Sequence, residues 1–486
     1  MTFIQMSSQS RTSKKSDFLR DARVKRRRLE MMGEFLSEFS NWLWGNLLYL
    51  LLGGGALFAL FSRFSPFAYL GHGLSLLLGR EQEVDAPGEV SHFRALCSAL
   101  SGTVGMGNVS GVAIAITQGG PGALFWMWVC ALLGMATKFY TCSLAVMYRG
   151  KDPDGVEQGG PMYFIREGLG EKWKPLAIFF AACGMFGCLP LLQSNQLTQI
   201  VRSMFFEPQG WFVGDAENTG NALFGLLLAV LVGLVVVGGI KRIGTVASRL
   251  VPGMVLLYGG TALVILLLHA GAVWPAFSLI LSDAFTGEAV AGGVLGTVIV
   301  TGVRRAAFSN EAGMGTEAMA HGAAKTKEPI REGLVAMWGP VIDTLFMCTL
   351  TGLVLLVTGV WDSGEGDGVL LTTQAFETAL PGFGPYLLLA GVLCLSFSSM
   401  LGFSYYVVKC GCFLFGQGAH LPVLGFYLLM IVVSAVVKMS DVINFLDIAF
   451  GLMAIPTILS TILLAPRVNW AARKYFRELR ERKAEA

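Results

Sequence analysis

Long runs of apolar residues, separated by short polar segments, dominate the chain from Trp42 onward. A helix needs about 20 mostly apolar residues to cross the hydrocarbon core of a membrane. Eleven segments meet this requirement: 42–61, 94–117, 121–148, 175–205, 222–238, 245–270, 288–305, 334–360, 386–409, 420–437 and 441–464. An open sheet would leave backbone groups unpaired in lipid, and the runs do not alternate as barrel strands do. The pattern therefore predicts an all-α integral membrane protein with about 11 transmembrane helices.

Composition agrees with this pattern. Hydrophobic residues make up 54% of the 486 residues and charged residues 14%, whereas about a quarter of an average soluble chain is charged. The net charge of +3 gives no reason to expect nucleic acid as a partner. Nearly all of the nine cysteines lie in apolar runs, so we interpret them as small hydrophobic residues rather than disulfides or metal ligands.

The charges between the spans predict the orientation, because cytoplasmic loops are enriched in Lys and Arg. One set of loops carries 22 of these residues: 62–93, 149–174, 239–244, 304–333, 409–420 and the tail 465–486. The loops of the other set carry one, Lys438: 118–120, 206–221, 271–287, 361–385 and 438–440. We predict a multi-pass protein of the cell inner (cytoplasmic) membrane, with the basic tail 465–486 in the cytoplasm.

The N-terminal extension 1–41 does not fit this bias. It carries nine Lys and Arg, although eleven spans and a cytoplasmic C-terminus would place it outside. The apolar run 42–61 is long enough for a span and longer than the apolar part of a signal peptide. Either the extension lies outside against the bias, or 42–61 does not cross the membrane fully.

Two spans contain segments that are poor helix material. Residues 101–111 combine four glycines with Ser, Thr and Asn, and residues 292–302 contain four glycines and two threonines. Non-helical backbone at mid-membrane is tolerated only where it is buried or lines a cavity, and paired breaks in two halves indicate a secondary transporter. Five spans lie in 94–270 and five in 288–464. We therefore predict two inverted five-helix repeats, with 42–61 as an extra transmembrane helix.

Three polar groups inside the spans each allow two interpretations. Ser396, Ser398 and Ser399 either complete a cation site or bond back to helix carbonyls. The run 193–196 (Gln-Ser-Asn-Gln) either meets a polar substrate or joins helices. Asp343 is either a cation or proton relay or the partner of a lysine such as Lys138.

The sequence also resembles a known family. The run GTVGMGNVSGVAIAITQGGPGALFWMWVCALLGMATKFYTCSLAVMYR at 102–149 and the run FSNEAGMGTEAMAHGAAKTKEPIREGLVAMWGPVIDT at 308–344 resemble signatures of the alanine or glycine:cation symporter family. Shorter matches are GGPMYFI at 159–165, GIKRIGTVASRLVP at 239–252 and FSSMLGFSYY at 397–406. The resemblance covers the chain from about 97 to 465. It implies a fold similar to that of the neurotransmitter:sodium symporters, within the amino acid–polyamine–organocation superfamily.

The resemblance also implies the binding residues. It places a sodium site at Ser101, Val104, Ser398 and Ser399, and it places a small neutral amino acid at Gly105, Gly107, Asn108, Gln193, Thr301 and Gly302. Met106 stands where the family usually has Thr, which leaves the identity of the amino acid open.

Other classes of function fit less well. The five histidines are scattered without a metalloprotease spacing, so we expect no enzyme and no cofactor apart from Na⁺ as coupling ion. A channel would repeat polar residues along several spans, whereas polarity here gathers at the two predicted breaks. We predict a sodium-coupled symporter that carries small neutral amino acids such as alanine or glycine into the cell by alternating access, and that works as a monomer. The alternative is proton-coupled or exchange transport of another small neutral or D-amino acid.

Overall fold

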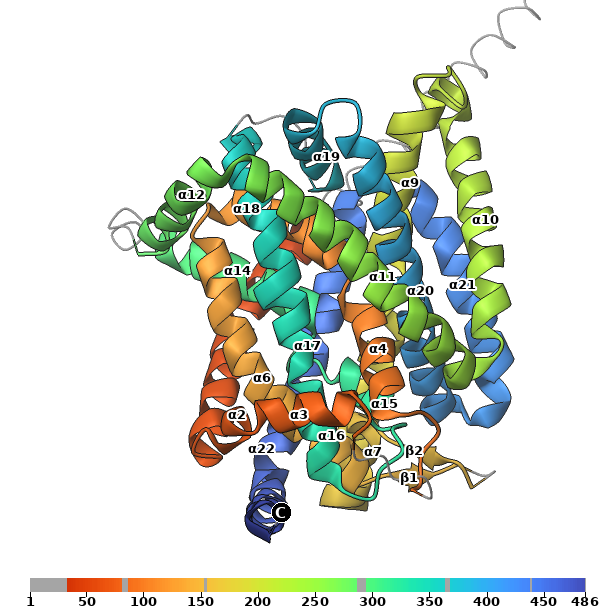
Figure 1. Cartoon of the computed structure of the whole chain (residues 1–486). Helices are drawn as coiled ribbons and strands as arrows, with labels where there is room; N and C mark the ends of the chain where they lie inside the picture. The colour runs from red at the N-terminus through yellow and green to blue at the C-terminus, as the bar shows by residue number, and fades with distance from the viewer. Residues whose placement is uncertain are drawn as a thin grey trace, which may run out of the picture.

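Helices make up nearly all of the computed structural model, which describes residues 33–80, 86–152, 155–285, 294–362, 368–437 and 439–485 (Figure 1). The first helix is Gly33–Phe61. The longer helices that follow are α4 (His92–Thr103), α5 (Val112–Gly119), α6 (Ala123–Met147), α7 (Pro161–Leu169), α8 (Lys174–Gly187), α9 (Leu191–Val201), α10 (Glu217–Val236), α11 (Gly239–Leu268), α12 (Ala270–Asp283), α14 (Val294–Asn310), α16 (Pro329–Ala336), α18 (Thr349–Thr358), α19 (Gly368–Ala379), α20 (Gly384–Phe415), α21 (His420–Val436) and α22 (Met439–Glu485). The shorter elements are α2 (Ser65–Ala68), α3 (Leu70–Leu77), α15 (Thr316–His321), α17 (Trp338–Pro340), the π-helical turns η1 (Gly107–Gly111), η3 (Arg202–Phe206) and η5 (Val341–Cys348), the 3₁₀ turns η2 (Glu171–Trp173), η4 (Gly214–Ala216), η6 (Val360–Asp362) and η7 (Gln417–Ala419), and the strands β1 (Gly150–Lys151) and β2 (Glu157–Gln158), which pair antiparallel.

Ten of the eleven predicted spans coincide with helices that are long and apolar enough to cross a membrane. Among the described residues, nine single helices or helix series pass this test, and the bent pair α4 and η1–α5 makes a tenth. The seventh predicted span, 288–305, overlaps α14, whose 17 residues are extended by α15 after a break. The all-helical membrane fold is therefore confirmed.

The position predicted for the second break is wrong. α14 is a continuous helix from Val294 through Gly302 to Asn310, while Gly292 and Gly293 lie outside the described residues. Gly302 serves close helix packing, because a Cβ atom there would lie 2.5 Å from the carbonyl oxygen of Ala123. The helix ends instead at 311–315, where three residues adopt left-handed backbone angles: Glu311 (φ 57°), Gly313 (φ 89°) and Gly315 (φ 85°). A left-handed residue cannot continue a right-handed helix, which explains the stop.

The two broken helices run past each other in opposite directions. Val90, before α4, forms a bridge with Ala324, after α15. Midway, a Cβ atom at Gly107 would lie 3.2 Å from the Cα atom of Ser309, and at the far end a Cβ atom at Gly119 would lie 3.1 Å from the Cβ atom of Thr301. As the residue number rises along α4 and α5, the residue number of the contact partner in α14 and α15 therefore falls. This is the antiparallel relation expected of the first members of two inverted repeats.

Helix Gly33–Phe61 runs parallel to α22. Cβ atoms at Gly451 and Gly54 would lie 2.8 Å from Leu47 Cδ1 and 2.9 Å from Ile458 Cγ2, respectively, and Trp44 Nε1 donates to the carbonyl of Asp447 at 3.0 Å. Both helices therefore begin at the same end of the molecule. The helix is thus long and apolar enough for a full span, while residues 1–32 of the N-terminal extension lie outside the described residues.

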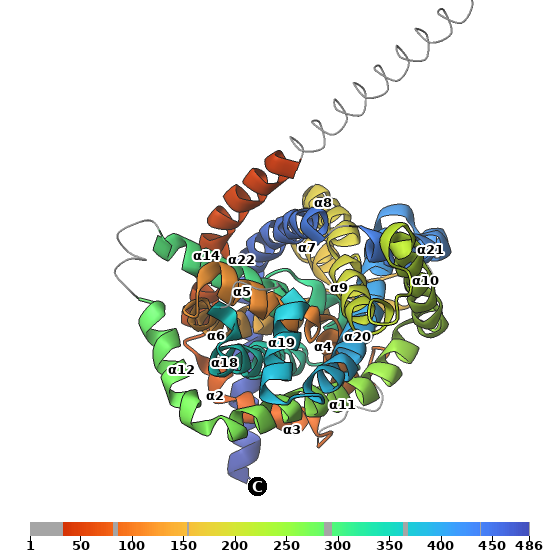
Figure 2. The ribbon, with the colours of Figure 1, turned by 90° about the horizontal axis from the view of Figure 1, so that it is seen from above.

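One end of the molecule, which we call the basic face, carries α3, α7, β1, β2, α15, α16 and the C-terminal end of α22 (Figure 1). Arg304 and Arg305 do not belong to it, although they were counted there from the sequence. Both lie within α14 and form ion pairs with Asp447, near the start of α22. Viewed from above, α4, α5, α6 and α19 lie towards the centre, while α10, α11, α12 and α21 follow the rim (Figure 2).

Candidate functional site

The first break separates α4 from η1. α4 ends at Thr103, and the next residue, Val104, has extended backbone angles (φ −75°, ψ 94°). The helix axes on the two sides of the break differ in direction by 53°. The last four carbonyl groups of a helix have no partner within it, and neither have the first four amides. The break therefore presents carbonyl oxygens from α4 and amides from η1–α5 to the centre of the molecule, where Val104, Gly105 and Gly107 are all buried.

Asn108 holds the first break in shape and ties it to the second half of the chain. Its Oδ1 atom accepts a hydrogen bond from the amide of Gly105 at 2.7 Å. Its Nδ2 atom lies 2.6 Å from Asp343 Oδ1 and 3.2 Å from Ser309 Oγ. Because Asp343 belongs to η5 and Ser309 to the last turn of α14, one amide side chain connects three elements.

Asp343 is surrounded by hydrogen-bond donors. Besides Asn108, the hydroxyl groups of Ser309 and Thr344 donate to its Oδ2 atom at 2.8 and 2.7 Å. Within the described part of the chain, Asp343 and Lys138 form no ion pair, although both side chains are fully buried. Of the two alternatives for Asp343, the structure therefore does not show the direct ion pair with Lys138. A carboxylate with three donors of this kind is satisfied by hydrogen bonds instead.

The second break is built around buried polar groups. Asn310 Oδ1 accepts from the amide of Ala312 at 2.9 Å, and its Nδ2 atom donates to Thr344 Oγ1 at 3.0 Å. The hydroxyl of Thr316, at the start of α15, donates to the carboxylate of Glu311. Glu311 is itself fully buried. The segment 310–316 thus binds to η5 on one side and to its own backbone on the other.

The sodium site implied by the resemblance joins α4 to α20. A Cβ atom at Gly105 would collide with Ser399 Oγ, and one at Gly402 would lie 2.7 Å from Ser101 Oγ. Ser399 therefore lies against the backbone of the first break. Ser398 faces the other way, because its hydroxyl lies 3.2 Å from Met254 Sδ on α11. The structure places Ser399 against Gly105, the residue after Val104, and Ser101 against Gly402 on α20, while the role of all four predicted residues in binding sodium stays a prediction.

The carbonyl of Leu395 also faces this region, although no sequence pattern pointed to it. It accepts from both Ser398 and Ser399 at 3.0 Å and would lie 3.7 Å from a Cβ atom at Gly105. A backbone carbonyl is an oxygen ligand of the kind that hard cations bind, and any residue type can supply it. Sequence reasoning finds such a group only through its neighbours in space.

The polar run at 193–196 divides between the two roles that the sequence left open. Ser194 and Asn195 join α9 to α21, by hydrogen bonds to the carbonyls of Ile431 and Ser434 at 2.7 and 3.0 Å. Gln196 accepts from the amide of Val369 on α19 at 3.2 Å. Gln193 is buried, and its Oε1 atom has no hydrogen-bond partner in the structure as described. Gln193 therefore has a buried acceptor available for a ligand.

Thr301 and Gly302 lie in helix contacts away from the breaks. Thr301 packs against Gly119, and Gly302 packs against the backbone of Ala123. Eight residues of helix separate Thr301 from Ser309, which corresponds to about 12 Å. Their assignment to the substrate pocket stays a prediction, and the end of α14 meets the first break through Ser309 instead.

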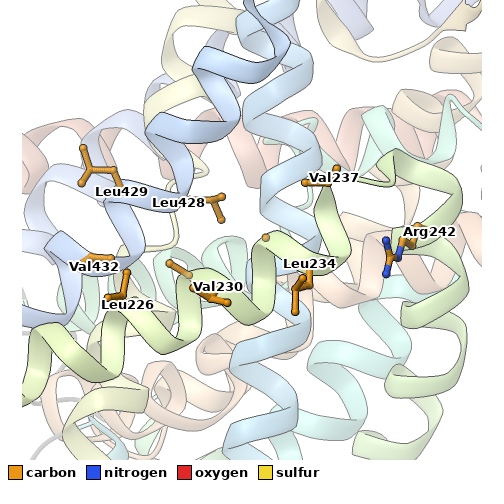
Figure 3. Close-up of a pocket in the computed structure, with 10 residues that line it drawn as sticks. Leu226, Val230, Leu234, Val237, Arg242, Leu428, Leu429 and Val432 are labelled. Atoms are coloured by element: carbon orange, nitrogen blue, oxygen red, sulfur yellow. The ribbon is translucent and has the colours of Figure 1, made fainter.

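Two cavities elsewhere in the described structure are alternative candidates for a ligand site. An apolar groove of about 630 Å³ lies between α10 and α21, where Leu226, Val230, Leu428 and Val432 line it and Arg242 is the charged residue (Figure 3). Such a lining gives an amino-acid zwitterion a partner for at most one of its charges. A cavity of about 210 Å³ between α9, α10 and α21 is polar, but there Arg202 and Glu217 already form an ion pair with each other. The breaks remain the better candidate.

Comparison with known proteins agrees with this geometry. The sequence model of the sodium:alanine symporter family matches residues 29–486. The chain belongs to the sodium:alanine symporter family. Within this family, the sodium/alanine symporter AgcS of Methanococcus maripaludis is 38% identical over 459 residues, which cover 92% of this chain and 98% of the relative. A probable sodium/glutamine symporter GlnT of Bacillus subtilis is 33% identical over 391 residues, which cover 80% of this chain and 79% of the relative.

A solved structure confirms the fold that the resemblance implied. The crystal structure of MhsT in complex with L-phenylalanine matches with a TM-score of 0.55, covers 79% of this chain and 98% of that one, and is 14% identical in sequence. A likeness at this identity concerns the fold alone. Members of the sodium:alanine symporter family with this fold are multi-pass membrane transporters of amino acids.

Proposed function

We propose that this protein imports a small neutral amino acid, alanine or glycine, together with sodium and by alternating access. The observation that carries the proposal is the meeting of the first break with Ser399 on α20, beside the Asn108–Asp343 hydrogen bond. An ion bound between Ser399 and the carbonyls of Ser101 and Val104 would link α4 to α20. The same ion would fix the shape of the break that receives the substrate, so that each ligand raises the affinity of the other.

A zwitterion needs partners for both of its charges, because neither charge enters an apolar site unpaired. The amides of η1, next to Gly105 and Gly107, suit a carboxylate, since the amino-terminal end of a helix is partly positive. Carbonyl oxygens at the end of α4 and the acceptor of Gln193 suit an ammonium group. Because Gly107 has no side chain, the backbone of η1 can pack directly against Ser309 at the end of α14.

The outer end of this region is covered by α19. A Cβ atom at Gly368, the first residue of α19, would lie 3.3 Å from Ser110 Cβ in η1 and 2.8 Å from Gln196 Oε1. Substrate that enters from this side therefore requires a movement of α19 or of the helices beneath it. We place the basic face in the cytoplasm of a cell whose inner membrane holds the protein as a monomer. Alternating access then follows from the rocking of one helix bundle against the rest of the molecule.

Uptake of labelled alanine into vesicles with the purified protein tests the proposal. We expect saturable uptake that falls at least tenfold when external sodium is replaced by choline at constant pH. A panel of competing amino acids, L- and D-alanine, glycine, serine and glutamine, then ranks the substrates. Uptake that ignores sodium but follows an imposed pH gradient would instead establish the proton-coupled alternative.

A further inference from the structure

The segments that flank the two broken helices at the basic face pair with each other. The amide of Glu89 donates to the carbonyl of Ala323 at 2.8 Å, and the amide of Lys325 donates to the carbonyl of Val90 at 2.7 Å. Val90 and Ala324 form a parallel bridge between these hydrogen bonds. The chain entering α4 and the chain leaving α15 are thereby joined through their backbones.

Arg149, just after α6, reinforces this pairing. Its guanidinium donates to the carbonyl of Gly322 at 2.8 Å, to the carbonyls of Pro87 and Thr326 at 3.2 Å, and to the carbonyl of Ala324. Four carbonyls from both paired segments therefore meet a single cation. The fork of five N–H groups on arginine suits such multiple acceptance better than the single ammonium of lysine.

Glu332, on α16, binds both broken helices directly. One of its carboxylate oxygens pairs with Nδ1 of His92, the first residue of α4, and the other lies 2.5 Å from Nδ1 of His321, the last residue of α15. The carboxylate has no exposed surface, and the two imidazoles are 4% and 1% exposed. Removing one partner from a buried charged pair is costly, so all three groups constrain one another.

Contacts between these ends and α20 are weaker. Lys409 Nζ and Tyr405 OH both lie near the carbonyl of Met319 on α15, but at 3.4 and 3.5 Å. α4 packs against α11 where Ser98 meets Gly244, and a Cβ atom on this glycine would lie 3.3 Å from Ser98 Oγ. The Ser98 hydroxyl donates to the carbonyl of Arg94 within its own helix. The ion pairs of Glu332 thus lie within the group α4, α15 and α16, and Arg149 adds hydrogen bonds from the end of α6. The contacts of this group with α11 and α20 are packing contacts and long hydrogen bonds.

We propose that Glu332 is a positioning residue that fastens the basic-face ends of α4 and α15 to α16. The three ends then move as one unit when the transport path opens on this face, and α4 does not swing out alone. The proposal rests on the proposed function, because it concerns how alternating access takes place in this chain.

Disulfide crosslinking in a variant without the nine native cysteines tests it. Val90→Cys with Ala324→Cys joins α4 to α15, since paired strands lie about 4.8 Å apart, within the reach of a disulfide. The control pair, Ser98→Cys with Gly244→Cys, joins α4 to α11. We expect the first crosslink to leave at least half of the sodium-driven alanine uptake, and the control crosslink to lower uptake at least tenfold until a thiol reductant restores it.

Two results would overturn the proposal. One is a tenfold loss of uptake in the first crosslinked pair that reduction reverses, and the other is full uptake in the crosslinked control. Wild-type protein that shows no sodium-dependent uptake would contradict the proposed function instead, so the two failures are distinguishable.

Glu332→Gln gives an independent readout. Its amide group cannot accept hydrogen bonds from both imidazoles, so we expect about a tenfold loss of uptake. Oxidation of the Val90→Cys and Ala324→Cys pair in the same chain should restore at least half of the rate, and reduction should remove it again. Wild-type uptake in Glu332→Gln, or no rescue by the disulfide in a variant that purifies as folded protein, contradicts the positioning role. If Glu332→Gln does not fold, the crosslinks alone decide.

Discussion

The side-chain amide of Asn108 donates to the carboxylate of Asp343 across 2.6 Å, although 235 residues separate them in the sequence. The bond joins the first helix break to a π-helical turn in the second half of the chain. A π-helical turn carries an extra residue and frequently marks a functional site, and here it lies beside the residues that shape the break. The bond therefore connects the two halves of the fold at the place where the substrate is proposed to bind.

Asp343→Asn should lower alanine uptake at least tenfold. The amide places two N–H groups where the carboxylate accepted from Asn108, Ser309 and Thr344, and an unpaired buried donor costs about 1–3 kcal/mol. Uptake and thermal stability of the detergent-purified protein should both be measured. Ser309→Ala is the matched control, because it removes one donor and leaves the carboxylate in place. Normal sodium-coupled uptake in Asp343→Asn would exclude Asp343 from the mechanism.

Ser399→Ala and Ser398→Ala should differ, although the two residues are neighbours. Ser399 lies against Gly105, whereas Ser398 faces Met254. We expect Ser399→Ala to raise the sodium concentration for half-maximal uptake about tenfold, or ~1.4 kcal/mol, and Ser398→Ala to change it less than threefold. Sodium titrations of initial uptake rates measure both. Equal effects would show that both hydroxyls contact the ion, as the resemblance implied.

Gly105→Ala should abolish uptake, because the added methyl group collides with Ser399 Oγ. Gly402→Ala should also impair the protein, since its Cβ atom would lie 2.7 Å from the backbone nitrogen of Gly102. Overpacking of this kind costs about 1–3 kcal/mol. Gly260→Ala, on α11 with no atom within 4 Å of the added methyl group, should keep wild-type uptake and stability. Equal tolerance of all three changes would contradict the close helix crossing.

Gln193→Ala and Asn195→Ala should separate binding from stability. Gln193 Oε1 has no partner in the described structure, so its loss should raise the alanine concentration for half-maximal uptake several-fold with little effect on melting temperature. Asn195 donates to the carbonyls of Ser434 and Val437, so its loss should lower the melting temperature and leave substrate affinity nearly unchanged. Comparing KM and thermal melting for both variants checks this division. The reverse pattern would assign Gln193 to helix packing.

The hydrophobic runs were sufficient to predict the spans, because a membrane imposes one length and one helical solution on every segment. The first break was also found, since Gly105, Gly107 and Asn108 combine weak helix propensity with polar side chains. The second break was misplaced because glycine was counted as a helix breaker at Gly302, where it serves helix packing. The observed break depends on the left-handed backbone of Glu311, and glutamate rarely adopts this conformation, so the sequence does not predict it.

For the candidate site, the sequence and the resemblance supplied residues to consider but not their contacts. Helical periodicity shows that Ser398 and Ser399 point about 100° apart, but it does not show which of them faces the break. Asp343 was recognised as a buried acid with two possible roles, but its partners Asn108 and Ser309 come from distant parts of the chain and could not be identified from the sequence. Contacts of this kind depend on how distant helices cross.

The parallel course of helix Gly33–Phe61 and α22 has a practical consequence for labelling. Because the two helices start at the same end and α22 is the longer, we expect reporters placed ahead of the first helix and after the last turn of α22 to lie in different compartments. A fluorescent protein that matures only inside the cell would glow at one terminus and stay dark at the other. An epitope tag ahead of the first helix would be open to antibodies on intact spheroplasts, while transport is measured in the same cells.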